Sequence, residues 1–72
     1  MARYTILRKG SNAANQSMTL GWVPVDTQEA ATADEALEKS QVDCYNNQVL
    51  RASVKFPLGY RRSKADGSYF DR

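Results

Sequence analysis

The sequence predicts an α+β domain in which one helix packs across a small antiparallel sheet, in the order strand, strand, helix, strand. Residues 3–8 and 50–56 alternate between polar and apolar side chains as strands do, and a helix-start signature stands between them at Thr32. At 72 residues the chain has room for one core. We expect residues 1–57 to form this β-β-α-β core and residues 58–72 to add a C-terminal hairpin or arm to the same domain.

The N-terminal part of the chain predicts two antiparallel strands joined by a long loop. Residues 3–8 form the first strand, although Leu7 departs from the alternation. Residues 10–17 are rich in turn formers and have no periodicity, which indicates a loop. A second strand is expected over residues 18–25, and Pro24 favours an edge position or a bulge because proline cannot donate a hydrogen bond to a strand ladder.

The clearest local signal is a capping box, in which the Thr32 hydroxyl accepts a hydrogen bond from the Glu35 amide while the Glu35 carboxylate accepts one from the Thr32 amide. A helix is therefore expected to begin at Thr32. Asn46 and Asn47 are expected to end it, because asparagine tolerates the left-handed conformation that terminates helices. Cys44 is expected to be a small buried hydrophobe on a stripe of mostly small residues that packs against the sheet. This stripe consists of Ala33, Ala36, Leu37, Ser40 and Cys44.

The third strand is expected over residues 50–56, where apolar side chains alternate with polar and basic ones until Pro57 ends the run. Its apolar face predicts core positions at Leu50, Val54 and Phe56. Residues 65–68 then predict a turn. The tail beyond the strand therefore either folds into a short hairpin or is an arm that orders on a partner.

Charge is distributed unevenly along the chain. Residues 26–43 carry six carboxylates and one lysine, whereas the other cations stand before and after this stretch. Such segregation predicts one acidic face and one basic face, each able to select a partner by the sign of its charge.

Missing residue types exclude several classes of site. With no histidine and one cysteine, the chain lacks the residues for zinc sites of the Cys/His type, for Ser-His-Asp triads and for Cys-His dyads. We therefore expect a protein that is not an enzyme and that holds no metal or cofactor. One cysteine cannot form an internal disulfide, and no apolar run reaches membrane-spanning length. These features favour a cytoplasmic protein that binds no membrane, with a virion component as the alternative location.

Two segments are candidate binding sites. The C-terminal segment interleaves aromatic side chains with cations, a composition that suits a protein partner with an acidic surface and also suits single-stranded nucleic acid. Its candidate partner-binding residues are Tyr60, Arg61, Arg62, Lys64 and Tyr69. The long N-terminal loop offers uncharged hydrogen-bonding side chains, as a second recognition loop requires. Its candidate residues are Ser11, Asn12, Asn15 and Gln16.

The first functional hypothesis is a non-enzymatic protein-binding module, namely an inhibitor, an adaptor or an accessory component of a larger assembly. Small cofactor-free proteins of this kind are common among phage and mobile-element products, so the analogy of size suggests such an origin. The second hypothesis is a protein that binds RNA or single-stranded DNA through the basic third strand and the C-terminal segment. Residues 29–37 also resemble the strand-into-helix junction of small hairpin-helix-strand modules, such as a family of eukaryotic and archaeal ribosomal proteins and the B subunit of phenylacetyl-CoA epoxidase. This resemblance implies a third hypothesis, a small subunit of a multi-chain complex.

Overall fold

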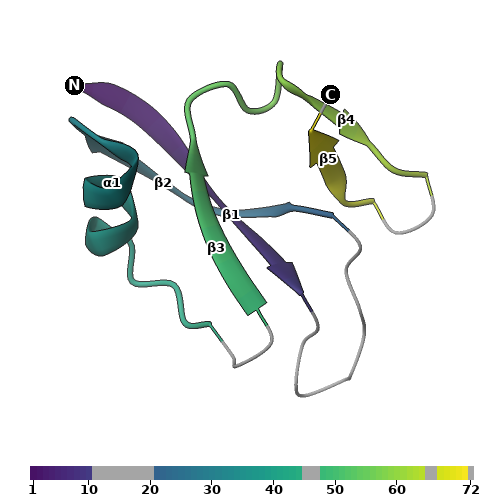
Figure 1. Cartoon of the computed structure of the whole chain (residues 1–72), viewed down its shortest axis with the longest axis horizontal. Coiled ribbons are helices and arrows are strands. Elements are labelled where there is room, and N and C mark those ends of the chain that lie inside the picture. Colours follow the sequence, from purple (N-terminus) through teal and green to yellow (C-terminus); the bar gives the residue numbers. More distant parts are fainter. Residues whose placement is uncertain (11–20, 45–47, 65–66, 72) are drawn as a thin grey trace.

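The computed structural model describes residues 1–10, 21–44, 48–64 and 67–71 (Figure 1). Three strands form an antiparallel sheet, one helix packs on it, and two short strands form a C-terminal hairpin. The elements are β1 (Ala2–Gly10), β2 (Val23–Ala30), α1 (Ala33–Lys39), β3 (Gln48–Ser53), β4 (Tyr60–Arg62) and β5 (Tyr69–Asp71). The predicted α+β fold is confirmed.

The central strand of the three-stranded sheet is β1, which pairs antiparallel with β2 on one side and with β3 on the other. A bulge interrupts the first pairing, because Ile6 pairs with Asp26 whereas the next residue, Leu7, pairs with Pro24. Val25 is the extra residue of the bulge. Pro24 thus lies on an edge strand at a bulge, as its sequence context predicts.

On the helix side of the sheet, Ile6, Ala30 and Ala36 form a fully buried cluster. The two alanines carry no atoms beyond Cβ, which lets α1 lie close to the strands. Larger side chains that are partly buried surround this cluster and complete the aliphatic core. They are Tyr4, Val25, Leu37, Leu50 and Ala52.

Both faces of β1 are covered at its centre. Ile6 and Leu7 are consecutive, so their side chains point to opposite faces of the sheet, yet both are completely buried. Leu7 therefore departs from the alternation because it faces a second packed layer. Near this second face, Trp22 and Tyr69 exchange two backbone hydrogen bonds, of 2.6 and 2.8 Å between nitrogen and oxygen, and thereby join the hairpin to the chain just before β2.

The helix is shorter than the sequence predicts, since α1 ends at Lys39 and the expected stop at Asn46 and Asn47 is wrong. Ser40 already has extended dihedrals, with φ −68° and ψ 138°. The Ser40 hydroxyl accepts a hydrogen bond from the Val42 amide at 3.4 Å, a local contact that competes with helix continuation.

Cys44 is exposed, so its predicted burial is also wrong. Because the helix ends at Lys39, the chain does not carry Cys44 onto the packing face of α1. The Cys44 thiol instead donates a weak hydrogen bond to the Gln48 carbonyl, with 3.0 Å between sulfur and oxygen.

Two predicted strand boundaries need correction. The second strand was expected over residues 18–25, of which 18–20 lie outside the described residues. The structure gives β2 as Val23–Ala30, because β1 offers backbone partners up to Ala30 and the exposed edge tolerates charged residues. The third strand ends at Ser53, where its pairing with β1 ends. Val54 is therefore 57 % exposed and not a core residue, and Phe56 leaves the sheet to pack against the hairpin.

The molecule is flat, with extents of 35 × 25 × 13 Å. Figure 1 shows α1 toward one end of the longest axis and the β4–β5 hairpin toward the other. The uneven charge of the sequence thus becomes a separation in space, because α1 carries acidic residues and the hairpin carries cations.

Candidate functional site

The C-terminal hairpin holds most of the predicted site residues. Tyr60 pairs with Asp71, Arg61 with Phe70, and Arg62 with Tyr69. A hydrogen bond of 2.7 Å from the Ser63 amide to the Ser68 carbonyl extends the pairing toward the turn. Gly67 has φ +76° in this turn, a conformation that side chains rarely adopt.

An aromatic cluster forms the base of the hairpin. The Phe56 ring contacts the rings of Tyr60 and Tyr69 edge to face, with centroid distances of 5.4 and 4.9 Å. Tyr60 is only 3 % exposed, so its ring is part of the packed interior and supports the hairpin. Edge-to-face contacts of this kind stabilise beyond the burial of area alone.

Cations lie over the rings of Tyr60, Tyr69 and Trp22. The Lys55 ammonium lies 6.0 Å from the Tyr60 centroid, and the Arg62 guanidinium lies 5.8 Å from that of Tyr69. Trp22 is approached by two cations from different strands. Their distances to its centroid are 5.3 Å for Arg51 and 5.7 Å for Lys9. Cation–π attraction therefore links the hairpin end to β1 and β3.

An ion pair fastens the last strand of the hairpin to the sheet. The Arg51 guanidinium of β3 donates to the Asp71 carboxylate of β5. This hydrogen bond is the main cause that lowers the pKa of Asp71, and it raises the pKa of Arg51. The buried Tyr60 hydroxyl makes no well-formed hydrogen bond in the described part of the chain, although it is near enough to the pair to lower the pKa of Asp71 slightly.

Gly21 lies directly against the hairpin. A Cβ atom built on Gly21 would lie 2.6 Å from the Tyr69 carbonyl oxygen and 2.9 Å from the Ser68 hydroxyl. Both neighbours are fixed, because the Tyr69 backbone is hydrogen-bonded to that of Trp22 and Ser68 is completely buried. Only glycine leaves room for this contact.

The predicted partner-binding residues separate into two groups. Tyr60 is buried, Tyr69 is half-buried, and Arg62 is exposed but lies over the Tyr69 ring. Arg61 and Lys64 are exposed. Among the Lys and Arg residues that the structure describes, only these two and Arg3 have a side chain with no hydrogen bond, ion pair or ring contact. Lys64 also lines a hollow of about 450 Å³, together with Arg62, Ser63 and Gly67.

The predicted recognition loop of Ser11, Asn12, Asn15 and Gln16 lies outside the described residues.

Sequence reasoning missed three contributors to the hairpin end: Trp22, Arg51 and Asp71. Arg51 and Asp71 are 20 residues apart, so no local pattern connects them. One signal for this ion pair was available: the basic C-terminal segment contains few carboxylates, so each of them has several possible cationic partners.

Two aliphatic side chains are exposed between β3 and β4. Val54 is 57 % exposed and Leu58 is 86 % exposed, and both lie in the segment that leads into β4. Leu58 and Arg61 are three residues apart, so their Cα atoms lie within about 10 Å of each other. The hairpin end therefore presents apolar and basic side chains together.

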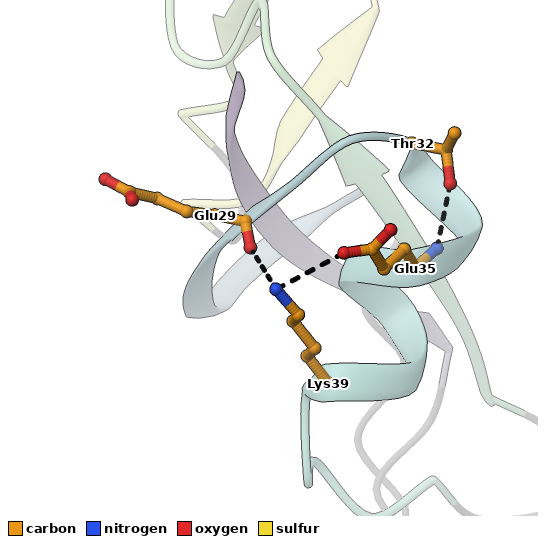
Figure 2. Close-up of polar contacts among 4 residues, drawn as sticks. All are labelled: Glu29, Thr32, Glu35 and Lys39. Carbon is orange, nitrogen blue, oxygen red and sulfur yellow. Dashed lines mark hydrogen bonds and ion pairs between the residues drawn. The ribbon is translucent and has the colours of Figure 1, made fainter. Parts of the chain in front are cut away.

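The opposite end of the molecule is organised around Lys39 (Figure 2). The Lys39 ammonium donates to the Glu29 carbonyl at 2.9 Å and pairs with the Glu35 carboxylate at 3.3 Å. The Glu35 amide donates to the Thr32 hydroxyl at 3.2 Å, which confirms that half of the predicted capping box. The Glu35 carboxylate is turned to Lys39, whereas the Glu29 carboxylate points away from the group.

Comparison with known proteins assigns no family: no family model, no curated protein and no solved structure matches this chain. Within the described ranges, no three His, Cys, Asp or Glu residues lie together as a metal site would require. No described helix combines the length and the apolar character needed to cross a membrane.

Proposed function

We propose that this chain is a non-enzymatic protein-binding module that uses its hairpin end to bind an acidic surface of a partner protein. The binding surface consists of Arg61 and Lys64, and exposed Leu58, three residues before Arg61, supplies its apolar part. The aromatic cluster and the Arg51–Asp71 pair hold this surface in place and are not themselves contact residues.

The observation that carries the proposal is the contrast between engaged and free cations. Arg51, Arg62 and Lys55 are occupied by contacts within the chain, whereas Arg61 and Lys64 are exposed and unpaired in the described residues. Because the hairpin is already folded, the chain loses little conformational freedom when these free cations meet a partner. They therefore suit electrostatic steering and recognition.

The exposed aliphatic side chains favour a protein partner. Protein interfaces combine a desolvated apolar centre with arginine and a polar rim, and Leu58 beside Arg61 offers both. A phosphate backbone offers no apolar surface for Leu58 to cover.

The ring contacts disfavour the alternative of single-stranded nucleic acid. Binding by base stacking needs open aromatic faces. Here Tyr60 is buried, and cations of the same chain already lie over Tyr60, Tyr69 and Trp22. Stacking of a base would have to displace these contacts.

Association with partners from the native host, measured with and without nuclease, tests the proposal. Arg61→Glu should slow association with a nuclease-resistant partner by roughly tenfold, because it reverses a steering charge. Arg3→Glu is the matched control, since Arg3 is also an exposed, unpaired strand cation in the described part of the chain but belongs to β1. Both variants should keep the thermal melt of the wild type.

Loss of every partner on nuclease digestion would contradict the proposal and favour the nucleic-acid alternative. A steep decline of affinity with salt would accompany that result, because phosphate contacts release counterions. Equal binding by wild type, Arg61→Glu and Arg3→Glu would exclude the hairpin as the interface.

A further inference from the structure

We infer that the hairpin binds the acidic outer face of α1 on a second copy of this chain. The protein thus pairs with itself through opposite charges. This inference rests on the proposed function, because it uses the same hairpin surface and names an occupant for it.

The acidic side of the contact is a pair of carboxylates on α1. Asp34 and Glu38 are four residues apart and so share one face of the helix. Both are exposed, and neither carboxylate has a partner in the described part of the chain. Like charges at this spacing repel, so the helix face is stabilised when cations from outside approach it. The neighbouring Glu35 differs because Lys39 already neutralises it at 3.3 Å (Figure 2).

The basic side is the pair of free cations on the hairpin, Arg61 and Lys64. They match the two free carboxylates of α1 in number and are opposite in sign. The same chain thus exposes two unpaired cations at one end and two unpaired carboxylates at the other. The two ends are therefore complementary in charge.

The positions of the two surfaces make the pairing geometrically simple. They lie toward opposite ends of the longest axis, which is 35 Å (Figure 1). Two copies side by side and antiparallel bring each hairpin to the helix of the other copy, which is a two-fold symmetric arrangement. Once one contact has formed, the second forms within the same complex and gains from a high effective concentration.

Exposed ion pairs are individually weak, so the expected dimer is weak and sensitive to salt. In about 0.01 M salt the screening length is about 30 Å, whereas in about 1 M salt it is about 3 Å. Sedimentation of the wild type at chain concentrations up to about 1 mM should show a mass of two chains in the low salt, and of one chain in the high salt.

A charge exchange identifies the residues. Arg61→Glu alone and Glu38→Arg alone should each weaken the dimer by about tenfold or more, because each places like charges together at both contacts. An equal mixture of the two variants should restore the dimer, since glutamate at 61 then meets arginine at 38 and the other contact is native. Arg3→Glu, with the same change of charge on β1, should leave dimerisation unchanged. Circular dichroism checks that each variant is folded.

A wild-type mass of one chain at about 1 mM in low salt would overturn the inference. So would a mixture of the two variants that dimerises no better than either variant alone. The two proposals can fail separately. If the wild type is monomeric but its partner binding still depends on Arg61, self-pairing is excluded and the hairpin remains an interface.

Discussion

The helix side of the sheet and the hairpin end of the molecule are stabilised in different ways. On the helix side, the fully buried side chains are aliphatic, and they gather around Ile6 of the central strand. At the hairpin end, three aromatic rings, the Trp22 side chain and an ion pair connect segments distant in sequence. The first region depends on exclusion of water from apolar surface, whereas the second depends on ring geometry and charge. The hairpin end is therefore the region where more of the stabilising contacts depend on charge and on single contacts.

The largest expected effect belongs to the helix side. Ile6→Ala should cost about 2–5 kcal/mol of unfolding free energy, because it leaves a cavity where the side chain is completely buried. Val49→Ala is the control, since Val49 is 54 % exposed on β3 and should change stability by less than about 1 kcal/mol. Urea melts measure both. Equal costs for the two variants would show that the aliphatic cluster is not the core.

The hairpin end should be most sensitive at Gly21. Gly21→Ala places a Cβ atom against the Tyr69 carbonyl oxygen and should cost about 1–3 kcal/mol, with a change in the fluorescence of Trp22, the only tryptophan. Gly59→Ala is the matched control, because its Cβ atom would meet Cδ and Cγ of Lys55 at 2.6 and 2.8 Å, side-chain atoms that can rotate away, and no backbone atom. If Gly59→Ala were the more damaging of the two, the hairpin would not depend on close approach at Gly21.

The helix cap should have a smaller effect. Thr32→Ala removes the acceptor of the Glu35 amide hydrogen bond and should cost about 1 kcal/mol of unfolding free energy. Thr32→Ser keeps a hydroxyl and should retain most of the stability in the same urea melt. A serine variant as unstable as the alanine variant would mean that the methyl group of Thr32, not its hydroxyl, stabilises the helix.

The smallest expected effect is a pH dependence at the hairpin end. The Arg51 hydrogen bond lowers the pKa of Asp71 in the folded chain, below the value of about 3.9 in the unfolded chain. The pair therefore stabilises fully above that unfolded value, and this stability is lost as the pH falls through the lower folded value. Trp22 fluorescence in urea between about pH 5 and pH 2 should show a loss that Asp71→Asn reduces. Asp34→Asn, which removes an unpaired carboxylate of α1, should not reduce this loss of stability. Identical pH profiles for wild type and Asp71→Asn would contradict the role of the pair.

The helix side could be predicted from the sequence because its signals are local. The alternation around Leu50 and the Thr32 capping box each lie within a few residues: Leu50 packs against the core, and the Thr32 hydroxyl accepts from the Glu35 amide as predicted. The end of the helix could not be predicted, because the turn at Ser40 depends on its own hydroxyl contact with the Val42 amide and not on the later asparagines.

The hairpin end could be predicted only in composition. The mixture of aromatic and basic residues indicated a binding surface, but not which of them are free. Tyr60 is buried because Phe56 leaves the sheet to pack on it, and Arg62 is held by Tyr69 across the hairpin. These contacts, like that between Arg51 and Asp71, join residues through the folded chain and leave no periodic pattern in the sequence.

The central claim is that contacts with the sheet order the hairpin in the free chain and leave Arg61 available to a partner. Hydrogen exchange of the Tyr69 amide, which donates to the Trp22 carbonyl at 2.8 Å, tests this most directly. The account predicts strong protection of this amide in the free wild type, unchanged protection in Arg61→Glu and lost protection in Gly21→Ala. Exchange of the wild-type Tyr69 amide at the rate of an unfolded chain would contradict it.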